Sequence, residues 1–224
     1  MRLILIRHGE PDYDNDCLTK TGHSQAEKTA ERLEKEHISR IFASPMGRAM
    51  ETAQYTADTL GLPINKLDFM HEIDWGFGEN NPIHNQNELQ SEGHPWSLSY
   101  RLLTENPEYV GSDKWDGHPF FRDNACLKDY RRVAAEFDGF LEQLGLIRKD
   151  GLYFCKEENE ETIAIFAHGG SGAVMLAELF SLPFPFVLTS LPYGLCSVSI
   201  VSFYAKSGEM VIPCMELFND MGHI

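Results

Sequence analysis

The sequence has no long apolar run and no paired cysteines. Its first apolar run, residues 3–6, is far too short for a signal peptide or a membrane-spanning helix, and no later run approaches the ~18 residues that a span needs. The five cysteines, at positions 17, 126, 155, 196 and 214, are scattered and form no CxxC pair. We therefore expect neither a disulfide framework nor a zinc site, but a cytoplasmic protein with reduced thiols.

Basic residues are also scarce. Lysine and arginine total 19 against 34 aspartates and glutamates, so the formal net charge is −15. Nucleic acids and anionic membranes both require a cationic surface, and the composition argues against either as a partner. A small anionic ligand is compatible with this balance if positive charge is concentrated at one site. The 224 residues suit one domain spanning 1–224, and a homodimer is left open.

Short apolar segments alternate with amphipathic ones along the chain. The pattern predicts strands at 3–6, 39–43, 67–70 and 162–167, helices at 19–36, 44–60, 123–144 and from 168–170 to about 180, and a closing hairpin from 194–204 and 209–216. Such alternation is typical of an α/β fold. We expect a three-layer α/β/α sandwich with a mostly parallel central sheet.

Residues 77–122 do not follow this alternation. The stretch is too long for a plain loop, and we interpret it as an inserted lid subdomain over one face of the sheet. A short helix is expected near 97–103. Several side chains of the stretch could line a substrate, although each is more often structural: His84, His94, Trp96, Tyr100, Arg101, Trp115, His118 and Arg122.

Basic and imidazole side chains follow three of the predicted strands. Arg7 and His8 come directly after the first strand, and His168 follows the strand at 162–167. Arg48 lies in the first turn of the helix after the second strand, where a cation is disfavoured unless an anion is bound nearby. Ligands bind beyond the carboxyl ends of parallel strands, so these residues should share one edge of the sheet. Such a site suits a tetrahedral phosphate, because arginines and helix N-termini can bind its oxygens and a neutral imidazole can act as a nucleophile.

Five segments, in order, resemble signature motifs of the histidine phosphatase superfamily, the phosphoglycerate mutase-like proteins. They are the LIRHGE run at 5–10, the LTxxGxxQA run at 18–26, the SPxxRAxxTA run at 44–53, the ExxxG run at 72–76 and the AHGG run at 167–170. The resemblance is strong at 1–80 and 160–180 and weak in the insertion. One RHG triplet would be weak evidence, but five segments in one order are specific.

The resemblance implies a mechanism. His8 would attack phosphorus and form a phosphohistidine, with its other ring nitrogen donating to a backbone carbonyl. Arg7, Arg48 and His168 would hold the phosphoryl oxygens. Glu72 would protonate the leaving oxygen and then act as base toward water. No metal or other cofactor is implied, because the arginines supply the positive charge, and the partner expected is a small phosphorylated substrate.

Two further substrate-binding candidates follow from the motifs. The family often has an asparagine in the phosphate pocket, a few residues after the RHGE motif. Here Asp14 lies near that position and Asn15 is one residue further, so Asn15 is a candidate ligand of the phosphate. Gly169, after the second histidine, is another. The acidic run at 12–16 is otherwise interpreted as a solvated loop at the pocket rim. Asp74 and Glu79 are the rivals of Glu72 for the role of general acid.

Three functions are weighed. A metal-independent phosphomonoester hydrolase of the histidine acid type is favoured. A cofactor-dependent phosphoglycerate mutase would need extra cations in the lid, where the sequence offers only Arg101, Lys114 and Arg122. A non-catalytic phosphate-binding protein would have lost a core residue, and none is missing. The large insertion also argues against a short protein-phosphohistidine phosphatase.

Overall fold

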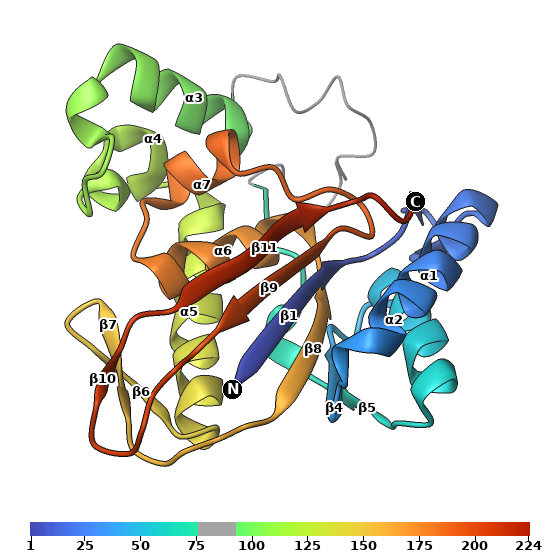
Figure 1. Cartoon of the computed structure of the whole chain (residues 1–224). Coiled ribbons are helices and arrows are strands. Elements are labelled where there is room, and N and C mark those ends of the chain that lie inside the picture. Colours follow the sequence, from blue (N-terminus) through green and yellow to red (C-terminus); the bar gives the residue numbers. More distant parts are fainter. Residues whose placement is uncertain (76–92) are drawn as a thin grey trace.

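A six-stranded sheet forms the centre of this computed structural model, which describes residues 1–75 and 93–224 (Figure 1). Its strands lie in the order β11 (Cys214–Asp220), β9 (Val198–Ser202), β1 (Arg2–Arg7), β8 (Thr162–Ala167), β4 (Arg40–Ala43) and β5 (Ile64–Lys66). The pairs β1–β8, β8–β4 and β4–β5 are parallel, whereas β9 runs antiparallel to both β1 and β11. The mostly parallel sheet is thus confirmed.

Helices cover both faces of this sheet (Figure 1). They are α1 (Lys20–Leu33) and α2 (Gly47–Leu60) on one face, and α5 (Ala125–Gln143) and α6 (Gly169–Phe180) on the other. The alternation along β1 explains the two layers, because Leu3 and Leu5 pack toward α5 and α6 while Ile4 and Ile6 pack toward α1 and α2. The three-layer sandwich is confirmed. Within 1–75 and 93–224, no helix combines the length and apolar character needed to cross a membrane.

The described part of the expected insertion, residues 93–122, contains α3 (Pro95–Glu105) and the short α4 (Pro119–Arg122). Helix α3 packs on α7 (Phe184–Ser190), a helix that the sequence pattern did not indicate. Trp115 is buried, with its ring 5.2 Å from that of Phe121 and 5.6 Å from that of Phe184. Its role is therefore in the core rather than at a substrate surface. Residues 77–92 of the insertion lie outside the described residues.

Two sequence-based predictions of strands are corrected. The segment 67–70 was expected to be a strand, but Asp68–Met70 forms a 3₁₀ turn and the strand lies earlier, at β5. The turn directs Phe69 and Met70 into the core instead. The single strand expected at 209–216 is two strands. The first, β10 (Met210–Val211), pairs with β7 (Leu152–Cys155), which also pairs with β6 (Leu146–Lys149). The second, β11, pairs with β9 and so forms the expected hairpin.

Candidate active site

His8 lies directly after β1, and its side chain is buried, with the residue 1% exposed. Its Nδ1 donates to the carbonyl oxygen of Gly9 at 2.7 Å, which leaves the lone pair of the neutral ring on Nε2. The Nε of Arg48 donates to that Nε2 at 3.3 Å. The ring therefore has the tautomer that a nucleophilic Nε2 requires.

Burial lowers the pKa of His8 well below its ordinary value, and the charge of Arg7 and, more weakly, of Arg48 lowers it further; the hydrogen bond to Gly9 opposes this. His8 is thus neutral at pH 7, and Nε2 can act as a nucleophile.

A close backbone contact between two glycines and one threonine side chain hold the backbone beside His8. A Cβ on Gly9 would lie 2.7 Å from the carbonyl oxygen of Gly22, so the loop after β1 and the start of α1 are in direct backbone contact. The Gly9 N–H donates to Thr52 Oγ1 of α2 at 3.0 Å. These contacts explain why the LTxxGxxQA and SPxxRAxxTA segments accompany the RHG triplet: they fix the nucleophile's backbone from two helices.

His168, at the end of β8, is fully buried beside His8, with the two ring centroids 5.2 Å apart. Its Nε2 lies 2.7 Å from the Oγ of Ser44, which follows β4. Burial lowers the pKa of His168 well below its ordinary value, and the nearby His8 and the two arginines lower it further. The ends of β1, β4 and β8 therefore meet at one edge, where the parallel sheet was expected to place them.

The helix that carries Arg48 was predicted to begin at residue 44, and its start lies three residues later. Helix α2 begins at Gly47, with Met46 at the N-cap and no side-chain cap bond from it. The Oγ of Ser44 instead accepts a hydrogen bond from the Met46 N–H at 3.3 Å and contacts His168. The serine is thus part of the histidine site.

Arg48 is nearly buried, with 6% of its side chain exposed, and its Nη1 lies 2.5 Å from Asp16 Oδ1. Asp16 Oδ2 also accepts a hydrogen bond from the Gly47 N–H at 2.7 Å. From the sequence, Asp16 was expected in a solvated acidic loop, and its contact with Arg48 was not predicted. One feature of the sequence pointed to this contact: Arg48 lies at a helix start, where a cation is unfavourable unless an anion lies nearby.

Arg7 reaches the same edge from β1. Its Nη1 donates to the carbonyl oxygen of Tyr193 at 2.7 Å, and a Cβ on Gly169 would lie 3.3 Å from its Cζ. Gly169, the first residue of α6, therefore packs on the guanidinium. Within the described residues, Arg7 Nε and His168 Nδ1 are buried without a hydrogen-bond partner.

Glu72 lies at the N-terminus of α6. Its carboxylate accepts hydrogen bonds from the N–H groups of Gly170 at 3.0 Å and Ser171 at 3.1 Å, which lie two and three residues after His168. Asp74, in contrast, is exposed, and its backbone N–H donates to Asp129 at 2.6 Å. Of these two carboxyl groups, Glu72 is therefore the better placed to act as the general acid. Glu79, the other rival, lies outside the described residues.

Asn15 is exposed, and its Nδ2 donates to Asp12 of its own loop at 2.8 Å. Among the contacts of the described residues, none joins it to the two histidines or to the two arginines. Tyr13 of the same loop lies closer, with its ring 5.4 Å from the Cζ of Arg48. The loop thus reaches the site through its Tyr13 and Asp16 side chains.

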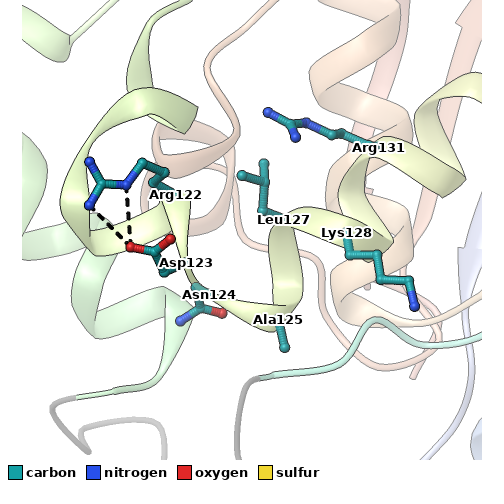
Figure 2. A pocket seen from close by; sticks show the side chains of 7 residues that line it. All are labelled: Arg122, Asp123, Asn124, Ala125, Leu127, Lys128 and Arg131. Carbon is teal, nitrogen blue, oxygen red and sulfur yellow. Dashed lines mark hydrogen bonds and ion pairs between the residues drawn. The ribbon is translucent and has the colours of Figure 1, made fainter.

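A separate hollow of about 430 Å³ lies where α4 meets α5 (Figure 2). Its lining is partly basic: Arg122, Asp123, Asn124, Ala125, Leu127, Lys128 and Arg131. Arg122 and Lys128 extend in opposite directions in this view (Figure 2), and Arg122 pairs with Asp123 at 3.2 Å. Arg131 pairs with Asp116 at 2.9 Å. The cations do not converge on one point, and none of the residues around His8 lines the hollow.

The two described histidines of the insertion act as helix caps. His94 Nδ1 accepts a hydrogen bond from the Trp96 N–H at 3.0 Å at the start of α3, and His118 Nδ1 accepts one from the Phe120 N–H at 3.2 Å at the start of α4. His84 lies outside the described residues. In residues 1–75 and 93–224, no three imidazole, thiol or carboxylate groups gather where they could hold a metal ion.

The stability of this region should depend on pH through His94. Burial lowers its pKa from 6.5 to about 4, so between these values the unfolded chain binds a proton that the folded chain does not. The free energy of unfolding should therefore decrease as the pH falls through this range. A His94→Asn variant keeps an N-cap acceptor that does not titrate, and its decrease should be shallower in urea unfolding measured at several pH values. Parallel curves for the two proteins would contradict this assignment.

Sequence comparison connects this site with a known family. Residues 3–112 match the sequence profile of the histidine phosphatase superfamily (branch 1). Proteins named probable phosphoglycerate mutase from Yersinia pestis (strain Pestoides F) and Yersinia pseudotuberculosis (serotype O:1b) are 32% identical over 92 residues. That match covers 37% of this chain and 43% of each relative, so the chain spans less than half the length of these relatives. Residues 3–112, just under half of the chain, thus carry the sequence pattern of the histidine phosphatase superfamily (branch 1).

Solved structures share the fold over nearly the whole chain. Phosphoserine phosphatase of Entamoeba histolytica, solved with phosphoserine, matches with a TM-score of 0.66 at 21% identity and covers 100% of this chain and 98% of that one. A mycobacterial glucosyl-3-phosphoglycerate phosphatase, solved with VO₃, matches with a TM-score of 0.65 at 20% identity, over 97% and 98% of the two chains. At this identity the likeness concerns the fold.

Proposed function

We propose that the protein is a phosphomonoester hydrolase that acts on a small phosphorylated metabolite through a phosphohistidine at His8. The observation that carries the proposal is the state of His8: a neutral ring whose Nδ1 donates to Gly9 and whose Nε2 faces Arg48. The buried Nε of Arg7 and Nδ1 of His168 lack partners among the described residues, and phosphoryl oxygens would satisfy them. The match of residues 3–112 to the histidine phosphatase superfamily and the fold neighbours named as phosphatases support the same proposal.

The proposed reaction has two steps. In the first, His8 Nε2 forms a bond to phosphorus as the bond from phosphorus to the leaving oxygen breaks, and Glu72 gives a proton to that oxygen. In the second, water attacks phosphorus, Glu72 takes its proton, and the electron pair of the breaking P–N bond returns to Nε2. Arg7, Arg48 and His168 stabilise the phosphoryl oxygens in both steps. The arginines supply the positive charge, and the scheme requires no metal ion.

Phosphoglycerate mutase-type transfer is the second candidate, because the sequence relatives carry that name. A mutase must hold a second anionic group of its substrate. Two of the three lid cations are already paired, Arg101 with Glu105 at 3.2 Å and Arg122 with Asp123 at 3.2 Å, which favours the hydrolase.

Product analysis separates the two functions. With phosphoglycerate as substrate, we expect release of inorganic phosphate and no measurable interconversion of the 2- and 3-phosphate positions. A coupled phosphate assay and NMR of the reaction mixture would follow both products in the same sample. Transfer between positions that is faster than phosphate release would overturn the hydrolase in favour of the mutase. A screen of phosphorylated metabolites would then identify the preferred substrate.

A further inference from the structure

Asp16 and Arg48 form an ion pair at the start of α2 that neither the family motifs nor the proposed reaction uses. Arg48 carries its charge in the first turn of the helix, where the helix dipole disfavours a cation. The carboxylate of Asp16 bonds both Arg48 Nη1, at 2.5 Å, and the Gly47 N–H, at 2.7 Å. The arginine side chain is 6% exposed and that of Asp16 is 41% exposed, so Asp16 neutralises a buried cation from the solvent side.

The chain holds Asp16 in place through its backbone. Asp16 has a φ of 48°, in the left-handed region, which aspartate adopts more readily than most residues. Its carbonyl oxygen lies so close to Gly47 that a Cβ there would be 2.0 Å away. The N-cap residue Met46 makes no side-chain cap bond, and Asp16 supplies that acceptor from a distant segment. The carboxylate is therefore fixed relative to α2 independently of any substrate.

The same contact determines the direction in which Arg48 faces. A guanidinium is planar, so with Nη1 held by Asp16 its Nε is directed at Nε2 of His8, 3.3 Å away. We infer that Asp16 is a positioning residue: it holds Arg48 so that the guanidinium faces the nucleophilic nitrogen of His8 and the phosphoryl group bound there. This inference rests on the proposed function. Asp16 itself contacts the arginine and the helix start rather than the histidine.

A double-mutant cycle tests the inference. In Asp16→Asn, kcat/KM for an aryl phosphate should fall about tenfold. A shift of about 1 Å in one oriented group can cost about 10²-fold, and we expect the loss of this ion pair to displace Arg48 by less than that. The Kd of inorganic phosphate, measured by calorimetry, should rise. In an Arg48→Ala background the same substitution should change either quantity by less than about twofold, since Asp16 acts through Arg48.

Matched variants separate positioning from charge and from folding. Asp12→Asn removes the same charge from the same loop, where Asp12 accepts hydrogen bonds from the backbone N–H groups of Asp14 and Asn15, and it should leave kcat/KM nearly unchanged. Asp16→Glu keeps the charge and should recover part of the activity that Asp16→Asn loses, even if the asparagine variant is less stable.

The outcomes are distinct. Unchanged activity in Asp16→Asn would show that the carboxylate does not position Arg48, and higher activity would show that it competes with phosphate. An equal loss in the Arg48→Ala background would show that Asp16 acts elsewhere. Each of these results overturns the inference, as would a glutamate variant no better than the asparagine one. If the wild-type protein releases no phosphate from any ester, the proposed hydrolase fails, but the cycle on phosphate binding still decides the role of Asp16.

Discussion

Replacement of His8 by alanine should reduce turnover of an aryl phosphate on the order of 10⁴-fold or more, because the proposed nucleophile is lost and no other group can form the phosphoenzyme. The neighbouring imidazole of His168 cannot replace it, because its ring centroid lies 5.2 Å away and its Nε2 contacts Ser44. Labelled phosphate should remain on the denatured wild-type protein and be released by mild acid. The His8→Ala protein should carry no such label.

Binding and stability measurements keep this result interpretable. Arg7, Arg48 and His168 remain in His8→Ala, so inorganic phosphate should still bind, and thermal unfolding should remain cooperative. His37→Asn is the matched control, because this histidine is exposed at the end of the 3₁₀ turn that follows α1 and has a positive φ that asparagine tolerates. A His8→Ala enzyme with appreciable turnover, or one that still becomes labelled, would rule out His8 as the nucleophile.

The main parts of the site could be predicted because they depend on local sequence. His8 follows a strand whose central residues 3–6 are buried, His168 follows a fully buried strand, and parallel strands end at a common edge. Asp16 could not be predicted in this way. Its contact with Arg48 joins residues 32 positions apart and depends on a left-handed backbone and on close approach to Gly47, neither of which has a periodic signal.

The insertion was the least predictable part of the fold, again for a physical reason. Its aromatic and histidine residues suggested a substrate surface. Trp115, however, packs in the core against Phe184 of α7, a helix whose short apolar sequence gave no helical period. His94 and His118 are also structural, because imidazole nitrogen can cap a helix as well as bind a ligand. Side-chain type alone does not distinguish these roles until the packing partner is known.

Replacement of Glu72 by glutamine should affect esters according to their leaving group. An alkyl phosphate needs a proton on the departing oxygen, and its turnover should fall about 10²- to 10⁴-fold without the general acid. A nitrophenyl phosphate has a leaving group that is stable without that proton, so its first step should be nearly unaffected. Its phosphoenzyme should then accumulate, because glutamine cannot accept the proton of the attacking water. Burst kinetics and labelling of His8 would measure both effects.

The structure makes this substitution a mild one and provides its control. A glutamine side chain retains an oxygen that can accept the N–H groups of Gly170 and Ser171, so the start of α6 and the adjacent His168 should keep their positions. Asp74→Asn alters the neighbouring exposed carboxyl group and should leave both esters unaffected. Equal losses for the two esters in Glu72→Gln would assign Glu72 a purely structural role. A leaving-group dependence that appears in Asp74→Asn instead would identify Asp74 as the acid.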